Sequence, residues 1–184
     1  MVLYNKFVPL EKRVRTLTDE MLDKIEASLA DILRRGFSSS SYVDVFGRTT
    51  PAVGHEGRAL FNAVENNIIT VDGTANPELS IKALDAIWVT GKNHLDAVGN
   101  HKALNYDTIL VTPHLRSKAD TLVNSEQLPG SSDNAINPIK GRFKVIDSAW
   151  LGGLMNVSGV DVNTDNYWFV FDSKRIKDQL KVKW

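Results

Sequence analysis

The side chains best suited to acid–base or metal chemistry are the four histidines, His55, His94, His101 and His114. His94 and His101 stand seven residues apart with Gly99 between them. This is not the i, i+4 spacing that places two zinc ligands on one face of a helix. The histidines are therefore expected to have surface or capping roles, and the sequence predicts no metal site.

His55 and Glu56 could serve as base and acid in a glycine-rich loop. A general base needs a positioned partner, however, and no nucleophile motif accompanies this pair. Ser148 and Ser158 lie in no Gly-x-Ser-x-Gly elbow of the hydrolase type. The sequence predicts no catalytic residue and no small-molecule substrate, and a small enzyme using His55 and Glu56 stays a minor alternative.

The glycines of the same region do not form a nucleotide-binding pattern. Gly47, Gly54 and Gly57 match neither the dinucleotide fingerprint nor the phosphate-binding loop with its terminal Gly-Lys-Ser/Thr. The chain also contains no cysteine, which removes thiolate nucleophiles, cysteine metal sites and disulfides. No cofactor is predicted.

The length, composition and charge of the chain are those of a globular protein without a strong net electrostatic field. The 184 residues are 42% hydrophobic, and 22 basic side chains balance 22 acidic ones. Such a chain can bury a core, and its net charge draws it neither to nucleic acid nor to an anionic membrane. The tail from Ser173 to Trp184 is locally basic. A weak contact of this tail with nucleic-acid phosphates is one hypothesis, and an ordinary solvated face is the other.

Membrane insertion is not expected. The longest apolar runs, Ile109–Val111 and Tyr167–Phe171, are far shorter than the roughly 20 residues that span a bilayer. The first seven residues make a poor secretory signal. Together with the lack of cysteine, this favours a cytoplasmic origin.

Periodicity predicts one long amphipathic helix near the start of the chain. Acidic residues follow Thr18, and Arg34-Arg35-Gly36 ends the pattern, so the helix is expected to span Thr18–Arg35. Its apolar positions, Met21 among them, are interpreted as ordinary core. They are Leu17, Met21, Leu22, Ile25, Leu29, Ile32 and Leu33.

Helices and strands then alternate irregularly. Ser80 is expected to cap a second helix, and the apolar run Tyr106–Thr112 is expected to be a strand that leads into a helix opened by Pro113. Further strands are predicted at Tyr42–Phe46, Arg142–Ile146 and Tyr167–Phe171, the last covered on both faces. A short helix is expected at Arg58–Glu65, and an exposed loop at Ser125–Gly141. The pattern is that of an α+β protein.

The tryptophans divide into two groups. Trp168 stands in the most apolar strand and is expected in the core. Trp150 and Trp184 stand in breaker-rich or terminal segments. Because aromatic side chains are enriched at interface centres, these two are candidate anchors between subunits.

Several segments follow one another in a particular order along the chain. The first runs from Gly57 to Asn67, followed by the helix that starts at Leu79-Ser80. The strand Ile109–Thr112 with Pro113 comes next. Asn137-Pro138 with Gly141 before a strand, and the strand Trp168–Asp172, complete the order. Taken together, these segments resemble the major head proteins of Mu-like tailed bacteriophages.

The resemblance implies the tailed-phage capsid fold named after phage Hong Kong ninety-seven. In that fold a peripheral domain carries a long spine helix, and an axial domain is built on a mixed sheet. Residues 1–57 would be peripheral, residues 58–172 axial, and residues 173–184 a basic tail returning to the peripheral domain. The chain resembles a capsid subunit trimmed at both ends.

The same resemblance implies a structural protein that assembles with copies of itself into a phage head shell. This shell would be assembled in the host cytoplasm, and the protein would be located in the virion. An encapsulin-like compartment shell has the same fold and stays an alternative. Exposed loops on rigid scaffolds commonly make contacts, so the loop Ser125–Gly141 is a candidate interface together with two tryptophans. The candidate interface residues are Leu128, Pro129, Asn134, Ile136, Trp150 and Trp184.

Overall fold

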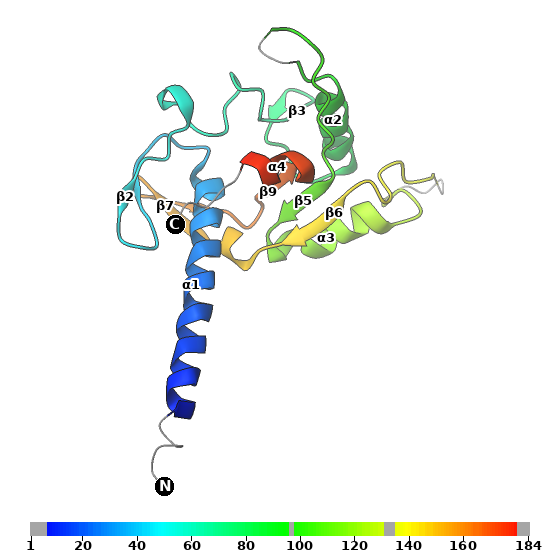
Figure 1. Ribbon diagram of the computed structural model, residues 1–184. Helices are drawn as coiled ribbons and strands as arrows, with labels where there is room; N and C mark the ends of the chain where they lie inside the picture. The colour runs from blue at the N-terminus through cyan, green and yellow to red at the C-terminus, as the bar shows by residue number, and fades with distance from the viewer. Residues whose placement is uncertain (1–6, 96–97, 131–134, 180–184) are drawn as a thin grey trace. The chain divides into compact units, whose positions relative to one another are not determined.

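The computed structural model describes residues 7–95, 98–130 and 135–179, but not the side chains of residues 7–9, 55 and 177–179. The chain forms two compact units (Figure 1). The first unit contains residues 1–60 and 157–159, and the second contains residues 61–156 and 160–184. Assigning these units to the peripheral and axial domains of a capsid fold stays a prediction.

The first unit is built on one long helix, α1 (Phe7–Arg35). The expected start at Thr18 is wrong, because the helix begins in the segment around Pro9. A proline in the first turn costs little, since the backbone N–H groups there have no acceptor within the helix. The hydroxyl of Thr18 does not cap the helix but donates to the carbonyl of Val14 (3.0 Å), as Thr16 does to Lys12 (3.0 Å).

A small hairpin follows α1. Strands β1 (Tyr42–Val43) and β2 (Thr49–Thr50) pair antiparallel, so the strand expected at Tyr42–Phe46 keeps only its first two residues. The turn is organised by the buried Asp44, whose carboxylate accepts from the backbone N–H groups of Phe46 and Arg48, both at 2.9 Å. The bond from the Arg48 N–H is the largest reason that the pKa of Asp44 lies below its ordinary value.

Turns replace the short helix expected at Arg58–Glu65, and that prediction is wrong. The side-chain oxygen of Asn62 accepts from the N–H groups of Val64 (3.0 Å) and Glu65 (3.1 Å), which closes a local turn. Among the described residues nearby, the only helical segment is the three-residue 3₁₀ turn His55–Gly57. Strands β3 (Thr70–Val71) and β4 (Thr74–Ala75) form the next hairpin. Its two turn residues, Asp72 and Gly73, have φ of 50° and 79°, as a tight hairpin requires.

The second unit is built around a mixed three-stranded sheet of order β6-β5-β9. The central strand β5 (Thr108–Val111) runs parallel to β6 (Lys144–Asp147) and antiparallel to β9 (Trp168–Phe171). Helix α3 (Pro113–Asn124) follows β5 directly, with Pro113 as its first residue, as the sequence predicts. The expected helix, strand and mixed-sheet classes are therefore present.

Helix α2 (Ile81–Lys92) also starts as predicted, since the Ser80 hydroxyl accepts from the N–H of Ala83 (3.2 Å). The helix continues through Gly91, where a Cβ would lie 2.7 Å from Cδ2 of Tyr106. Glycine thus allows the Tyr106 ring to approach the helix backbone. One buried cluster joins α2, β5, α3 and the segments that precede α2 and β6. Its members are Leu79, Leu84, Ile109, Val111, Leu115, Ala119, Leu122, Val123, Ile139 and Phe143.

The end of the chain differs most from expectation. The sequence does not reveal the hairpin of β7 (Leu154–Val157) and β8 (Val160–Asn163), although Ser158-Gly159, with φ of 53° and 86°, is a suitable turn pair. Strand β9, expected to be covered on both faces, buries Phe169 and packs the partly buried Trp168 and Val170 against the core cluster. The described part of the tail forms α4 (Ser173–Gln179) in the second unit.

Candidate subunit interface

The loop expected to make subunit contacts lies between α3 and β6, and its described ends are paired. The N–H of Leu128 donates to the carbonyl of Ala135 (2.8 Å), and the N–H of Asn137 donates to the carbonyl of Glu126 (3.0 Å). Gln127 and Ile136 form an antiparallel bridge. The loop therefore leaves the unit as a paired ribbon, and Asn134 lies outside the described residues.

Asn137 fixes the base of this ribbon. Its side-chain amide donates to the carbonyls of Leu122 (2.7 Å) and Ser125 (3.1 Å), and its side-chain oxygen accepts from the N–H of Ile139 (3.0 Å). Both Asn137 and Ile139 are buried. The prediction of an exposed loop from Ser125 to Gly141 is therefore wrong at the base. A buried amide with three bonds holds the loop on the end of α3.

The outer part of the ribbon offers apolar surface. Ile136 is 86% exposed, whereas Leu128 and Pro129 are half-buried. Lys140 and Glu126 form an ion pair of 2.8 Å beside them, and the hydrogen bond from Lys140 is the main reason that the pKa of Glu126 is lowered. The ribbon thus holds one exposed isoleucine on an anchored backbone.

Trp150 lies on a different segment, in the 3₁₀ turn Ala149–Leu151 after β6. Ser148 caps this turn by accepting from the N–H of Trp150 (3.4 Å), and the buried Leu151 anchors it. Trp150 itself is 41% exposed. Trp184 lies outside the described residues. Trp168, expected in the core, is half-buried and donates its indole N–H to the carbonyl of Pro77 (3.1 Å).

The residues considered for catalysis are only partly described by the structure. Glu56 pairs with Arg58 at 3.1 Å, and the side chain of His55 is not described. Leu95 and His101 form a backbone bridge. No group of three or more His, Asp or Glu residues that could hold a metal ion occurs among the described residues. Within those residues, no helix is both long and apolar enough to cross a bilayer.

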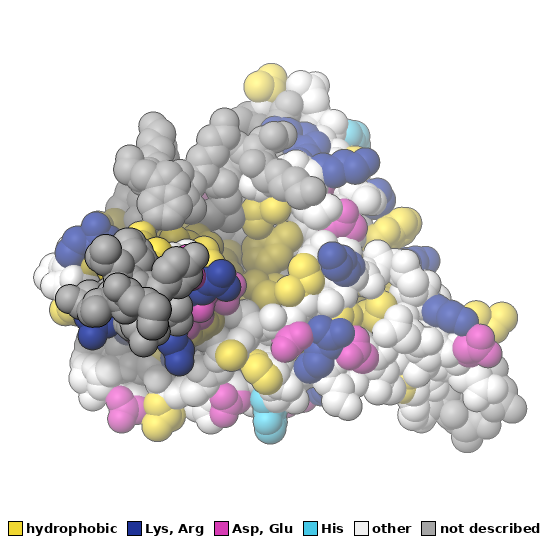
Figure 2. Space-filling view, turned by 60° about the horizontal axis from the view of Figure 1, so that its bottom comes forward, with side chains coloured by type: hydrophobic (Ala, Val, Ile, Leu, Met, Phe, Trp, Pro, Cys, Tyr) yellow, Lys and Arg dark blue, Asp and Glu magenta, His cyan; other side chains and the backbone are white. Residues whose placement is uncertain are grey.

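Surface charges of opposite sign lie next to one another on the face shown in Figure 2. Among the ion pairs of the described residues, Arg116 contacts both Asp120 and Asp147 at 2.7 Å. In the basic tail, Arg175 pairs with Asp172 (3.6 Å) and donates to the carbonyl of Ala103 (3.3 Å). Arg175, one of the cations that could bind a phosphate, is thus already paired within the chain.

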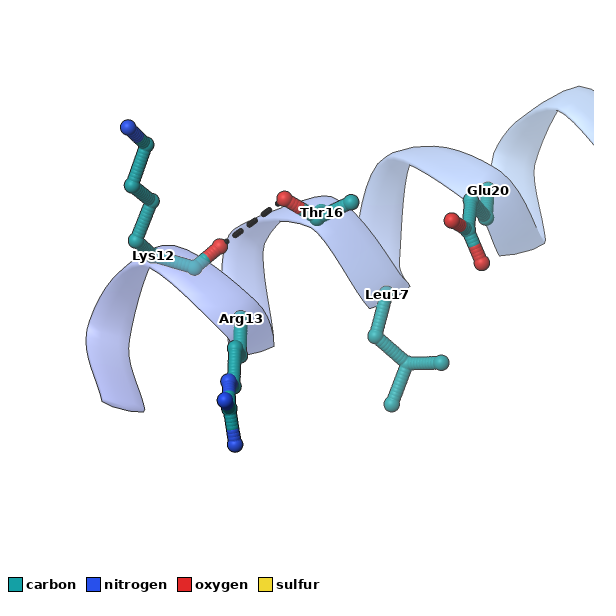
Figure 3. A pocket seen from close by; sticks show the side chains of 5 residues that line it. All are labelled: Lys12, Arg13, Thr16, Leu17 and Glu20. Atoms are coloured by element: carbon teal, nitrogen blue, oxygen red, sulfur yellow. Dashed lines mark hydrogen bonds between the residues drawn. The ribbon is translucent and has the colours of Figure 1, made fainter. Parts of the chain in front are cut away.

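The N-terminal half of α1 carries a second apolar surface. The interpretation of the apolar positions of this helix as core is wrong for Leu17, Met21, Leu22 and Ile32, which are exposed. Ile25, Leu29 and Leu33, farther along the helix, are half-buried. A shallow depression on the helix is lined by five residues of α1 alone, Lys12, Arg13, Thr16, Leu17 and Glu20 (Figure 3). A depression on a single helix cannot enclose a small ligand. The surface is therefore better suited to contact with another helix.

Comparison with known proteins gives one family match and one structural match. The model of a family described as "Phage capsid protein" matches residues 1–183. The search of curated proteins finds no match. Among solved structures, the chain is similar to one described as "Bacteriophage JBD30 capsid", with 30% sequence identity and a TM-score of 0.31. That match covers 39% of this chain and 21% of the other.

Proposed function

This chain belongs to the phage capsid protein family, which makes it a structural capsid protein of a phage; we propose that copies of it assemble into the shell of a tailed-phage head. The observation that carries this proposal is the family match, because it extends over residues 1–183 rather than over one motif. The expected virion location follows from the same match.

The Mu-like subtype and the Hong Kong ninety-seven type of fold belong to the proposal. Two features support them. A single helix of 29 residues, α1, has the length of a spine helix, and the second unit has a mixed sheet covered by helices, as an axial domain has. In this assignment α1 belongs to the peripheral domain and the sheet to the axial domain.

Shell formation would proceed through repeated contacts between identical subunits. Head-to-tail contacts close into a ring when the rotation between subunits closes, and other contacts join the rings. Each contact can be weak, because a subunit that already holds one neighbour meets the next at a high effective concentration. The mixed surface charge supports this arrangement, since it produces no strong repulsion between copies.

The ribbon between α3 and β6 is the proposed contact surface of the second unit. Ile136 would insert into a neighbouring subunit, with Leu128 and Pro129 around it, and Trp150 would add an aromatic contact. Anchoring by Asn137 supports this role, because a fixed backbone loses little conformational entropy on association. A contact of the tail with packaged DNA has weaker support, since Arg175 is already paired.

The test of the proposal is assembly of the purified chain, followed by negative-stain microscopy and analytical ultracentrifugation. The wild-type chain should give closed particles. Ile136→Asp should abolish them, because it places a charge in an apolar contact. Val64→Asp is the matched control, because Val64 is 68% exposed in the same unit but lies outside the proposed surface.

The control variant should assemble as the wild type does. If both variants assemble equally well, the ribbon is not the contact surface. If the wild-type chain stays monomeric at every concentration and salt tested, this chain does not form a shell by itself.

A further inference from the structure

The N-terminal half of α1 presents a continuous apolar stripe to solvent. Its four side chains follow one another at spacings of four, three and four residues, which is the pattern of helices that pack against a second helix. More than half of each side chain is exposed: Leu10 57%, Val14 56%, Leu17 59% and Met21 52%. Such a stripe extends over about 16 Å of helix, since each residue adds about 1.5 Å.

We propose that this stripe binds the same stripe of a second copy of the chain, with the two α1 helices antiparallel. The inference rests on the proposed function in one respect, that the partner is another copy, and it adds a contact of a different kind. Ring contacts join unlike surfaces, whereas an antiparallel helix pair joins like surfaces about a two-fold axis.

The charged side chains beside the stripe favour a second copy as the partner and an antiparallel direction of the two helices. Arg13 and Glu20 stand seven residues apart and project from the same side of α1 as Leu17 (Figure 3). When Leu10 lies opposite Met21 of the other copy, Val14 lies opposite Leu17. Arg13 then flanks Glu20 of the other copy, and the two-fold axis makes this attraction twice.

Other arrangements of the same two helices bring like charges together. In a parallel pair each residue lies level with its own copy, so Arg13 lies level with Arg13 and Glu20 with Glu20, and neither faces the opposite charge. In an antiparallel pair shifted by seven residues, Arg13 meets Arg13 of the other copy. The register with Leu10 opposite Met21 avoids both conflicts.

Engineered disulfides can test the geometry directly, because the chain contains no cysteine. The variants Leu10→Cys and Met21→Cys, carried on two differently tagged full-length chains, are coexpressed and oxidised. In the proposed pair the two substituted positions face each other and form a disulfide between differently tagged chains. Two copies of Leu10 lie about 16 Å apart along the pair, too far for the roughly 7 Å that a disulfide can bridge.

The expected result is therefore mixed disulfide dimers, with little dimer from either variant alone. Leu10→Cys combined with Leu22→Cys is the matched control. Leu22 is equally exposed at 57%, but it stands one residue away from the stripe and turned to one side of it. Dimers of the individual variants would show a parallel pair. Absence of any disulfide would show that something other than a second copy covers the stripe. Either outcome overturns the proposal.

A charge exchange tests the same register without cysteine. Arg13→Glu and Glu20→Arg should each lower the association constant of the pair by roughly five- to tenfold, because each creates two like-charge contacts. The double variant R13E/E20R restores both attractions and should recover the wild-type value. Failure of the double variant to recover association would contradict the assigned contact.

Microscopy of the same samples separates this inference from the proposed function. Particles that form without the disulfide between positions 10 and 21 would overturn the helix pair and leave shell assembly standing. Disulfide-linked pairs without particles would support the helix pair and count against assembly of a shell by this chain alone.

Discussion

Helices α3 and α1 both carry an apolar stripe along one face, but only the stripe of α3 is buried. In α3, Leu115, Ala119, Leu122 and Val123 pack into the cluster that includes Ile109 and Val111 of β5. In the N-terminal half of α1 the corresponding side chains are more than half exposed. An apolar stripe therefore shows which face of a helix will be covered, but not whether the cover comes from the same chain.

The largest difference between the two helices is expected when a leucine is truncated in each. Leu115→Ala should lower the free energy of unfolding of the second unit by about 3 kcal/mol, because it leaves a cavity in the core. Leu17→Ala should change it by less than about 0.5 kcal/mol, because Leu17 lies outside that core. Urea unfolding followed by tryptophan fluorescence measures both. Equal losses would mean that α1 is also packed into the second unit.

A buried polar side chain, Asn137, should also stabilise the second unit, although by less than a buried leucine does. Asn137→Ala should cost about 2 kcal/mol, because the carbonyls of Leu122 and Ser125 and the N–H of Ile139 lose their partner. Asn124→Ala, at the exposed end of α3, is the control and should cost less than about 0.5 kcal/mol. The same urea titration serves. If Asn137→Ala leaves the free energy of unfolding unchanged, water replaces the amide and the Asn137 side chain does not fix the ribbon.

A smaller effect is expected from acid, again in the second unit. Burial alone would raise the pKa of Asp107, but hydrogen bonds from the Ser173 hydroxyl (2.6 Å) and N–H (3.0 Å) and from Thr108 outweigh it, so the pKa is lowered. The stabilisation is complete above the ordinary pKa range of an aspartate. It is lost as the pH falls through the lowered value in the folded chain.

Ser173→Ala should therefore raise the pKa of Asp107 and reduce the stability lost on acidification by about 1 kcal/mol or less. A carboxyl NMR titration of the wild type and the variant measures the pKa, and urea unfolding at neutral and acidic pH measures the stability. An unchanged pKa in the variant would show that the Ser173 hydroxyl does not stabilise the carboxylate.

Local signals predicted the parts of the fold whose causes are local. Ser80 begins α2 because its hydroxyl accepts from an N–H three residues later, and Pro113 begins α3 because its missing N–H is not needed there. These elements could be predicted because the residues that form them are neighbours in the sequence.

Expectations failed where a local signal had two readings. Thr18 can cap a helix or donate to a carbonyl within one, and the structure shows the second. Asn62 closes a turn within Arg58–Glu65, where a short helix is expected from the sequence. The turn pair Ser158-Gly159 was present in the sequence, but the strands on either side are short and broken by exposed residues, so the hairpin was missed.

For the candidate interface, the sequence could indicate the segment but not its structure. An apolar residue in a polar loop marked Ile136, and a tryptophan among breakers marked Trp150. That the loop is a ribbon held at its base by Asn137 depends on carbonyls of Leu122 and Ser125, which only the folded end of α3 brings within reach. The exposed stripe of α1 was visible as a pattern and misinterpreted as core.

The sequence by itself determined the membership of the phage capsid protein family, the α+β class and the starts of α2 and α3, because these depend on residue type and short spacing. The tertiary structure decided the pairing of β5 between β6 and β9, the buried role of Asn137 and the exposure of α1. The physical reason is that burial and strand pairing are set by groups far apart in the chain. A local pattern predicts which face of a segment can be buried, and the tertiary structure determines which groups cover that face.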